Sequence, residues 1–519
     1  MREMRIHKFE THYRLPESVM AERQRLDQIR TMVLDGALEL ALERVGLPED
    51  GELCIRRVSV PVRLRLTGTD ASLAVLWSVA LAEEIERELH SGRSSNAVFY
   101  RSRRQALIDM AISIARGDVS RAWAWRQLGL WRASEPTSES EAVFELTQAL
   151  CAVSSMVIAV LCALSELQLL ARVLRRMTGK QFEALAYAAL SKAGATHLVD
   201  GADHAPTSRA LRDTMRVLNS SRILAAVTAS RLLVNETDEV CRAAAALIVL
   251  EAEPVLLRAA TAKELIALIA SALRSARSEV GGALLEQAEI DSESLAEQMR
   301  VDDEGPSARK AREYDERSLS EQTAGGEVDR ELEMAIEPEA ERDEEMAKVP
   351  DLQKRAFTRF GGLLFLLGVF EDLELAEEIL DNAALGARPF RWVIHQLALR
   401  LVAAKPDDAA VLAFSGLLPG AAPPSDDQPP PDEIEEGAIQ ELAARIVERL
   451  RLLLDWREEQ TAQLLEFISH RQAEIVGDPG WIDVKLLLDE ASVEIRRAGL
   501  DLNPGYLPWL GVVVRFVYE

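Results

Sequence analysis

Cysteine is scarce in this sequence. Its four cysteines are far apart and form no pair at the short spacing that zinc sites use: Cys54, Cys151, Cys162 and Cys241. A disulfide framework or a structural zinc site is therefore not expected, and a reducing compartment fits this cysteine usage best. The first residues, MREMRIHKFETHYRL, contain no apolar run of the kind found in secretory signals, so we expect a cytoplasmic protein.

Positive charge is in deficit. The chain has 60 Lys and Arg against 85 Asp and Glu, and the resulting net charge of −25 opposes binding to nucleic acid and to anionic membranes. Residues 149–165 (ALCAVSSMVIAVLCALS) lack charge but are fewer than the ~20 residues that a membrane-spanning helix needs. We interpret this run as a buried core helix, with a membrane span as the less favoured alternative.

The short motifs of common enzyme families are also missing. The sequence contains no HExxH, no G-x-S-x-G, no Walker loop, no EF-hand loop and no glycine-rich dinucleotide fingerprint. The histidines are dispersed, and acidic pairs are so frequent that they identify no catalytic site. We therefore expect no enzymatic activity, no cofactor, no bound metal and no small-molecule substrate.

Alanine, leucine and glutamate are abundant, and they favour helix. We predict a mainly α, multi-helical fold with small α+β elements at its ends and two flexible linkers. The predicted parts are a strand–helix–strand element (1–68), a helical domain (69–276), an acidic disordered linker (277–349), a helical core segment (350–416), a proline-rich linker (417–432), and a helix pair with a C-terminal β element (433–519).

Two segments with a period of two flank a helix in the N-terminal element. Apolar and polar side chains alternate in residues 9–15 and 58–66, which predicts two strands with one wet face each. Between them, apolar residues at helical spacing predict one buried stripe: Leu26, Ile29, Val33, Ala37 and Leu40. We hypothesise that the C-terminal strands complete this sheet and bring the chain ends together.

Three tryptophans lie close together in the helical domain, in the segment WAWRQLGLW: Trp123, Trp125 and Trp131. Exposed tryptophans dominate many interfaces, so these residues are candidates for partner binding. The interpretation that we favour places them in a core between helices.

The core segment after the acidic linker contains apolar residues spaced for one buried helix: Phe357, Phe360, Leu363, Leu364, Leu367 and Phe370. Gly361 and Gly362 permit close approach of another backbone and are candidates for a core or contact position. Residues 417–432 (LLPGAAPPSDDQPPPD) are predicted to be semi-extended and unpacked.

Residues 480–519 carry the densest pattern of the chain. Alternation predicts strands at 482–486 and 493–496, and β-branched and aromatic residues predict another at 512–518. An apolar cluster between them contains Trp509, a further core or partner-binding candidate. A chain end this apolar is predicted to be tied into a sheet.

Three blocks of the sequence resemble proteins of phage-tail-like, extracellular contractile injection systems, in the family labelled as tape-measure proteins. They are the N-terminal strand–helix–strand pattern, the run FGGLLFLL (360–367), and RRAGLDLNPGYLPWLG (496–511) with the VRF that follows. The blocks extend over the whole chain but cover only about a quarter of it closely.

This resemblance implies a non-enzymatic component that acts in assembly or length control of a contractile particle. Its partners would be tube, sheath, baseplate or cap proteins, and it would be cytoplasmic during assembly or carried within a released particle. The alternative is a cytosolic helical scaffold or adaptor that binds protein partners through Trp123, Trp125 and Trp131.

Overall fold

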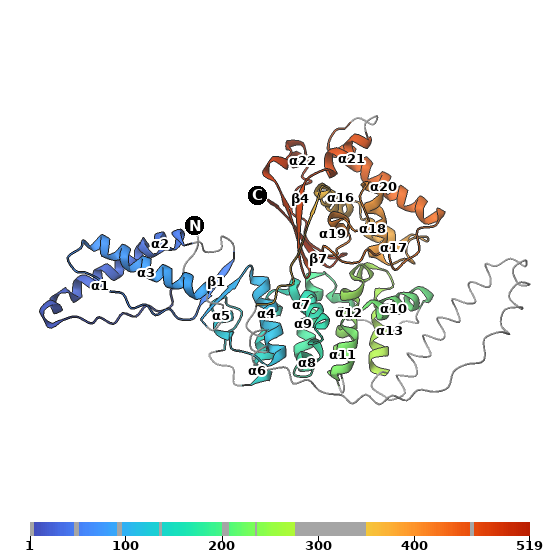
Figure 1. Cartoon of the computed structure of the whole chain (residues 1–519). Coiled ribbons are helices and arrows are strands. Elements are labelled where there is room, and N and C mark those ends of the chain that lie inside the picture. Colours follow the sequence, from blue (N-terminus) through green and yellow to red (C-terminus); the bar gives the residue numbers. More distant parts are fainter. Residues whose placement is uncertain are drawn as a thin grey trace, which may run out of the picture.

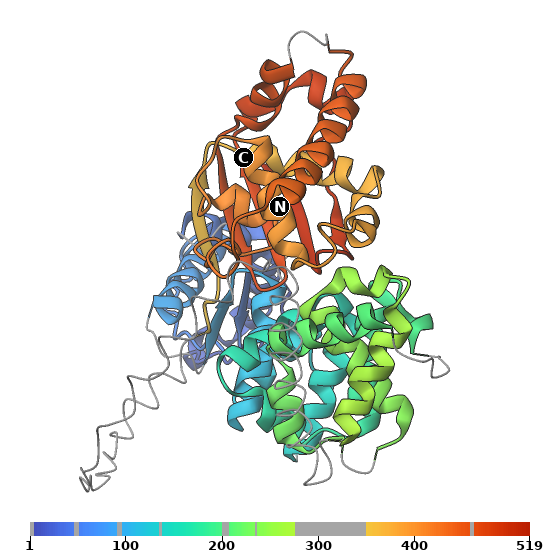
Figure 2. The same cartoon turned by 90° about the vertical axis from the view of Figure 1, so that its right-hand side faces the viewer.

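The computed structural model describes residues 5–45, 51–90, 96–133, 138–199, 207–233, 236–275, 349–456 and 461–519. It is mainly helical with small sheets, as predicted. The chain forms an N-terminal arm (5–90), a helical lobe (96–275) and a C-terminal lobe (349–519). Figures 1 and 2 show the C-terminal lobe lying on the helical lobe, and Figure 1 shows the arm projecting to one side.

A five-stranded sheet in the order β3-β4-β5-β7-β6 forms the centre of the C-terminal lobe. Its strands are β3 (Lys354–Thr358), β4 (Ala473–Asp478), β5 (Trp481–Leu486), β6 (Gly505–Leu507) and β7 (Val512–Tyr518). β5 and β7 run parallel, and the other neighbours are antiparallel. The predicted strands at 482–486 and 512–518 are confirmed, and β7 ties the chain end into the sheet.

Helices cover one face of this sheet. Because side chains alternate along a strand, the register neighbours Ile475, Val484 and Phe516 all lie on the buried face. Phe516 meets Phe365 with ring centroids 5.0 Å apart. The helices of this lobe are η7 (Gly361–Phe365), α16 (Leu366–Asp372), α17 (Leu375–Asp381), α18 (Phe390–Leu401), α19 (Ala409–Phe414), α20 (Glu433–Leu453), α21 (Thr461–Ser469), η9 (Leu488–Glu490) and α22 (Val493–Arg497).

The helical lobe is built around α12 (Asp238–Ala252). Residues 243–250 of this helix are apolar and buried on every side, which is typical of a helix at the centre of a stack. Its neighbours are α9 (Gly179–Lys192) and α13 (Ala262–Ser275). The lobe also contains α4 (Arg103–Arg116), α5 (Ala122–Gln127), α6 (Glu139–Ala152), η3 (Ser154–Met156), α7 (Val157–Glu166), α8 (Leu170–Leu174), η4 (Thr196–Leu198), α10 (Ser208–Ser220), α11 (Leu224–Ser230) and η5 (Pro254–Arg258).

The uncharged run 149–165 does not form one helix. It falls on α6, η3 and α7, and the chain bends by 110° between α6 and α7. Among the described helices no single one is long and apolar enough to cross a membrane, and this bent pair meets that test only when its two helices are taken together. Its apolar side chains, such as Leu150, Val157 and Val160, are buried in the lobe.

The arm has a small core of its own, separate from that of the lobes. Its elements are η1 (Glu17–Glu22), α1 (Arg23–Met32), the π-helical turn η2 (Val33–Ala37), α2 (Leu38–Arg44) and α3 (Asp70–His90). The π turn includes Gly36, whose φ of 149° suits glycine.

This π turn changes which residues of the predicted stripe are buried. Leu26, Ile29 and Val33 are buried as predicted. The backbone at Gly36 is non-helical and kinks the helix, and the buried positions after the kink lie one residue later than predicted, at Leu38 and Ala41. Leu40, predicted to be buried, is instead 60% exposed.

Three strand predictions are wrong. Residues 9–15 and 58–66 alternate in burial but belong to no ladder, and the strands near them are β1 (Glu52–Ile55) and β2 (Ala97–Tyr100). Residues 493–496 lie in the helix α22, whose first turn is capped by Ser492 accepting from the Ile495 amide. The C-terminal strands belong to the sheet that also contains β3, and none of them pairs with the N-terminal element, so the hypothesis of one shared sheet is also wrong.

Two further expectations need correction. Phe357 is not part of a buried helix, because it lies on β3 and is 83% exposed. The proline-rich segment 417–432 is packed at its beginning, where Leu418 and Pro419 contact Gly477 of β4. The predicted acidic linker lies outside the described residues except for Val349.

The close approach at Gly362 can be tested by substitution. A Cβ at this position would lie 1.8 Å from the carbonyl oxygen of Ile468, a backbone atom that cannot move away cheaply. We expect Gly362→Ala to lower the free energy of unfolding by about 3 kcal/mol. The control Gly368→Ala, in the same region with open space around it, should raise stability by about 0.5–1 kcal/mol. Equal effects in denaturant titrations would contradict this account.

Acid should weaken the first turn of α20. Arg388 donates two hydrogen bonds to the buried Glu435, at 2.6 and 2.8 Å, and these bonds hold the pKa of Glu435 below its ordinary value of 4.5. A lowered pKa means that the stabilisation is complete above pH 4.5 and is lost as the pH falls through the folded-state value.

We expect Glu435→Gln to cost about 2 kcal/mol at pH 7 and progressively less below pH 4.5, measured by denaturant titration at several pH values. Glu448→Gln, which removes an exposed pair with Arg451 on the same helix, is the control and should change little. A Glu435→Gln effect that does not depend on pH would refute the assignment.

Candidate protein-interaction site

The sheet of β1 and β2 joins the arm to the helical lobe. Cys54 of β1 contacts the carbonyl oxygen of Ala124, with Sγ at 3.8 Å, and Gln127 donates to the carbonyl oxygen of Ile55 at 2.9 Å. Both partners belong to α5. The arm is therefore held on the helical lobe through α5.

A buried carboxylate fixes the second strand of this sheet. Asp109 of α4 accepts hydrogen bonds from Tyr100 Oη of β2 (2.7 Å), from Trp125 Nε1 (3.1 Å) and from Arg121. Burial has the largest influence and raises the pKa of Asp109, while these three donors act in the opposite direction. Burying a carboxylate is costly unless it is paired and hydrogen-bonded, so the three donors are what this site requires. The cluster aligns β2, α4 and α5.

Arg25 fixes the geometry inside the arm. Its guanidinium donates to Asp70 Oδ1 (2.7 Å) and to the carbonyl oxygens of Leu66 (2.8 Å) and Gly68 (2.6 Å). These bonds bring the beginning of α1 beside the beginning of α3. The two helices then lie side by side over a common core.

α3 has two apolar faces, and only one of them is covered. Leu73, Ala74 and Trp77 are buried in the core of the arm. On another side, Val75 is 48% exposed and Leu76 is 57% exposed. A helix that is apolar all round is ordinarily buried. This uncovered surface, called the open face of α3 below, is therefore suited to a partner.

Exposed apolar side chains are concentrated in the arm. In the described part of the chain, the arm exposes seven large apolar side chains: Ile6, Met20, Met32, Leu34, Leu40, Val75 and Leu76. The helical lobe exposes three, and the C-terminal lobe, which is about twice as long as the arm, also exposes seven. Scattered exposed apolar residues are normal on a soluble protein, but such a density on one projecting part favours an interaction surface.

The extended segments of the arm leave their backbone groups unpaired. Among the described residues, 9–15 and 58–64 form no backbone–backbone hydrogen bond. Their apolar side chains nevertheless pack on the helices, and the ring of Phe9 lies 6.3 Å from that of Trp77. A row of free N–H and C=O groups on an extended segment is a template for strand pairing. The arm thus offers strand edges as well as the open face of α3.

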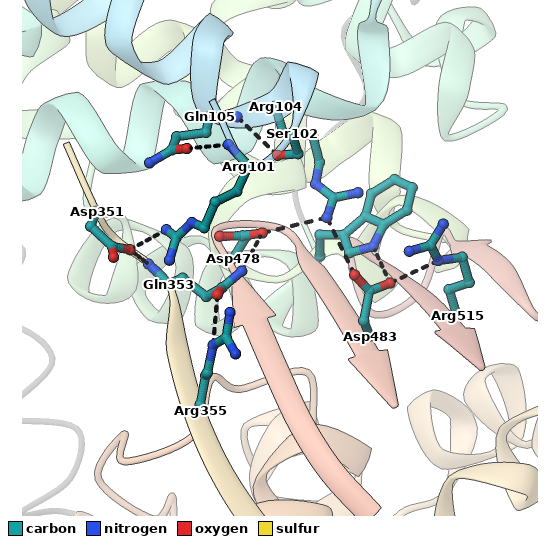
Figure 3. A network of polar contacts seen from close by, with 11 residues as sticks. Arg101, Ser102, Arg104, Gln105, Asp351, Gln353, Arg355, Asp478, Asp483 and Arg515 are labelled. Atoms are coloured by element: carbon teal, nitrogen blue, oxygen red, sulfur yellow. Dashed lines mark hydrogen bonds and ion pairs between the residues drawn. The ribbon is translucent and has the colours of Figure 1, made fainter. Parts of the chain in front are cut away.

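A polar network holds the C-terminal lobe against the helical lobe (Figure 3). Arg104 of α4 contacts Asp478 and Asp483 of the sheet, each at 3.4 Å between Nη2 and Oδ2. Its guanidinium also lies 3.9 Å from the ring centroid of Trp481. The two carboxylates are mostly buried, so this contact is shielded from solvent better than a surface ion pair.

Neighbouring contacts extend the network on both sides. Arg515 of β7 binds Asp483 at 2.9 Å, and Arg101 pairs with Asp351 on the segment before β3. α4 carries both Arg104 and Asp109. One helix therefore positions the C-terminal lobe and, through β2, the arm.

The structure places most residues singled out in the sequence inside the core. Trp125, Trp131 and Trp509 are at most 1% exposed, Trp123 is half-buried, and Gly361 and Gly362 are buried beside β4 and α21. These residues do not form a common surface. The adaptor alternative therefore has no exposed tryptophan patch to act through.

Sequence reasoning missed the open face of α3 and the junction at Arg104. A signal for the first is present, because Val75, Leu76 and Val79 form a second apolar stripe beside Leu73 and Trp77. A lone arginine in an amphipathic helix carries no such signal, so Arg104 could not be selected from the sequence.

Two kinds of chemistry are disfavoured among the described residues: metal binding, and attack by the Cys54 or Cys162 thiol on an electrophile. No group of three or more His, Cys, Asp and Glu side chains among them is arranged to bind a metal ion. Burial raises the pKa of the Cys54 and Cys162 thiols to about 12, so both stay protonated at neutral pH.

Comparisons of the chain with protein-family models, with curated proteins and with solved structures find no match. The resemblance to the tape-measure-labelled family therefore stays a prediction.

Substitutions of Arg104 and Arg515, which both contact Asp483, are expected to change the free energy of unfolding by unequal amounts. Arg104→Gln removes contacts to Asp478 and Asp483 and leaves two mostly buried carboxylates short of a partner, so we expect a loss of about 1–3 kcal/mol. Arg515→Gln removes a half-exposed partner of Asp483 and should cost under about 1 kcal/mol. Denaturant titration measures both, and a larger loss for Arg515→Gln would contradict the role given to Arg104.

Proposed function

We propose that this protein is a non-enzymatic component in the assembly or length control of a phage-tail-like contractile injection particle. The sequence blocks described above suggest the particle. The arm supplies the observation that supports an assembly role: it projects from the body and presents the open face of α3 beside two unpaired extended segments.

The arm combines two modes of protein recognition. An apolar helix face binds in a groove or against another helix, and an extended segment adds to the edge of a partner's sheet. Both modes suit a protein that joins repeating subunits, because each leaves the body of the protein outside the contact. Tube, sheath, baseplate or cap proteins are the proposed partners.

The folded lobes favour assembly over a ruler made of one stretched helix. The longest described helices, α3 and α20, have 21 residues each, which corresponds to about 32 Å at the usual rise per residue. The two lobes are also joined by one continuous apolar core, so stretching the chain would require unfolding them. Length control, where it operates, would therefore act through a folded terminating or scaffolding protein.

The experiment introduces Leu40→Glu and Leu76→Glu together into the full-length chain in cells that produce the particle. Both side chains are well exposed, so stability should change by less than about 1 kcal/mol. We expect the amount of protein that co-sediments with tube and sheath proteins to fall at least tenfold. Electron microscopy of the same cells should show few particles or particles of scattered length.

The control is Ile434→Glu on α20, a side chain that is 75% exposed on the C-terminal lobe. It places the same charge on an exposed apolar position outside the arm and should leave co-sedimentation unchanged. A wild-type protein that never sediments with the particle would refute the proposed function. Loss of another cytosolic partner in the arm variant, with normal particles, would favour the scaffold or adaptor alternative.

A further inference from the structure

β3 is an edge strand with one unpaired side. It pairs with β4 on one side, and no strand of the described chain lies on its other side. Its unpaired N–H and C=O groups are available to an added strand. This edge belongs to the C-terminal lobe, so it is independent of the arm and of the assembly role proposed above.

Phe357 makes this edge unusual. It lies near the middle of β3 and is 83% exposed, more than any other large apolar side chain among the described residues. Edge strands are normally protected from pairing by charges or prolines, and an exposed aromatic ring on an edge strand favours aggregation unless something covers it. Its register neighbour on β4 is Glu474, so no apolar side chain of the same sheet face lies directly beside it.

A cavity of about 630 Å³ opens beside Phe357. Its lining comes from the end of β3, from the segment before α19 and from the start of β4, and it includes Phe357, Phe360, Ala403 and Ala473. Its volume is larger than that of a leucine or phenylalanine side chain. Asp408 also lines the cavity, and its Oδ1 accepts hydrogen bonds from Thr358 Oγ1 (2.8 Å) and from the amide of Ala410 (2.9 Å).

The rim of this cavity is cationic. Arg359 and Lys405 line it and are exposed, and within the described part of the chain neither of them forms an ion pair. Arg359 lies over the ring of Phe360, at 4.9 Å from its centroid. In a protein of net charge −25, two unpaired cations beside an apolar opening favour an acidic ligand. They also disfavour a second copy of β3, because antiparallel pairing would bring like charges together.

We propose that the free edge of β3 and this cavity bind an extended, acidic segment of a partner protein. The segment adds a strand to β3 through backbone hydrogen bonds. One apolar side chain of the added strand enters the cavity beside Phe357, and acidic side chains meet Arg359 and Lys405 where the segment passes the end of β3.

The test measures fluorescence anisotropy of a labelled, end-blocked peptide of seven residues that alternates glutamate with leucine, titrated with the full-length protein. We expect Phe357→Ser to weaken binding at least tenfold and Lys405→Glu combined with Arg359→Glu to abolish it. Both changes are at exposed positions and should leave thermal unfolding unchanged. The control Ile434→Ser, another exposed apolar position of the same lobe, should bind as the wild type does.

Two further peptides separate the contributions. A peptide with lysine in place of glutamate should bind at least tenfold more weakly, and a peptide with alternate backbone amides methylated should lose binding. Equal binding of the lysine peptide would overturn the charge assignment. Equal binding of the methylated peptide would overturn strand addition.

Replacing Phe357 with the photo-cross-linker benzoylphenylalanine identifies the occupant directly. A cross-link to the added acidic peptide supports the proposal. A cross-linked dimer without peptide would instead assign the edge to a second copy, and a cross-link to residues 277–348 of the same chain that the peptide does not displace would assign it to the acidic linker. Either of these results would overturn the partner assignment.

Discussion

Asp109 is the charge on which the arrangement of the three parts depends. Its carboxylate lies in the middle of α4 with no exposure to water, where an uncompensated charge costs several kcal/mol. Its donors are Tyr100 of β2, Trp125 of α5 and Arg121, which comes directly before α5. Satisfying one buried charge therefore fixes a strand and two helices relative to one another. The same helix carries Arg104, so the C-terminal lobe is positioned from the same element.

Side chains alternate between the two faces of the C-terminal sheet, and the two faces make different contacts. One face, with Ile475, Val484 and Phe516, forms the core with the covering helices. The other face carries the row of Arg355, Val476, Asp483 and Arg515, in which only Val476 is apolar, and its end nearest α4 meets Arg104 (Figure 3). Because charged side chains on this face cannot be buried without partners, the contact with α4 is made of ion pairs. Phe357 lies on the same face, on the edge strand β3, and is exposed.

Sequence reasoning succeeded where local periodicity decides structure and failed where one residue changes the period. The strand at 482–486 follows from alternation and the strand at 512–518 from β-branched and aromatic residues, and no turn signal interrupts either of them. Residues 493–496 alternate as well, but Ser492 offers a helix cap, and the stretch is short enough for the cap to decide. The π turn at Gly36 shifts the stripe of α1 and α2, and no pattern of apolar residues reveals such a turn beforehand.

The sequence by itself determined the helical class, the strands at 482–486 and 512–518, and the close backbone approach at Gly361 and Gly362. These properties depend on residue type and on spacing over a few positions. Only the tertiary structure decided that β3 pairs with a strand more than a hundred residues later, that Trp125 and Trp131 are buried, and that Phe357 and Leu76 are exposed. The physical reason is that burial and pairing are set by contacts between distant segments, and an apolar residue has the same local pattern whether a neighbour covers it or not.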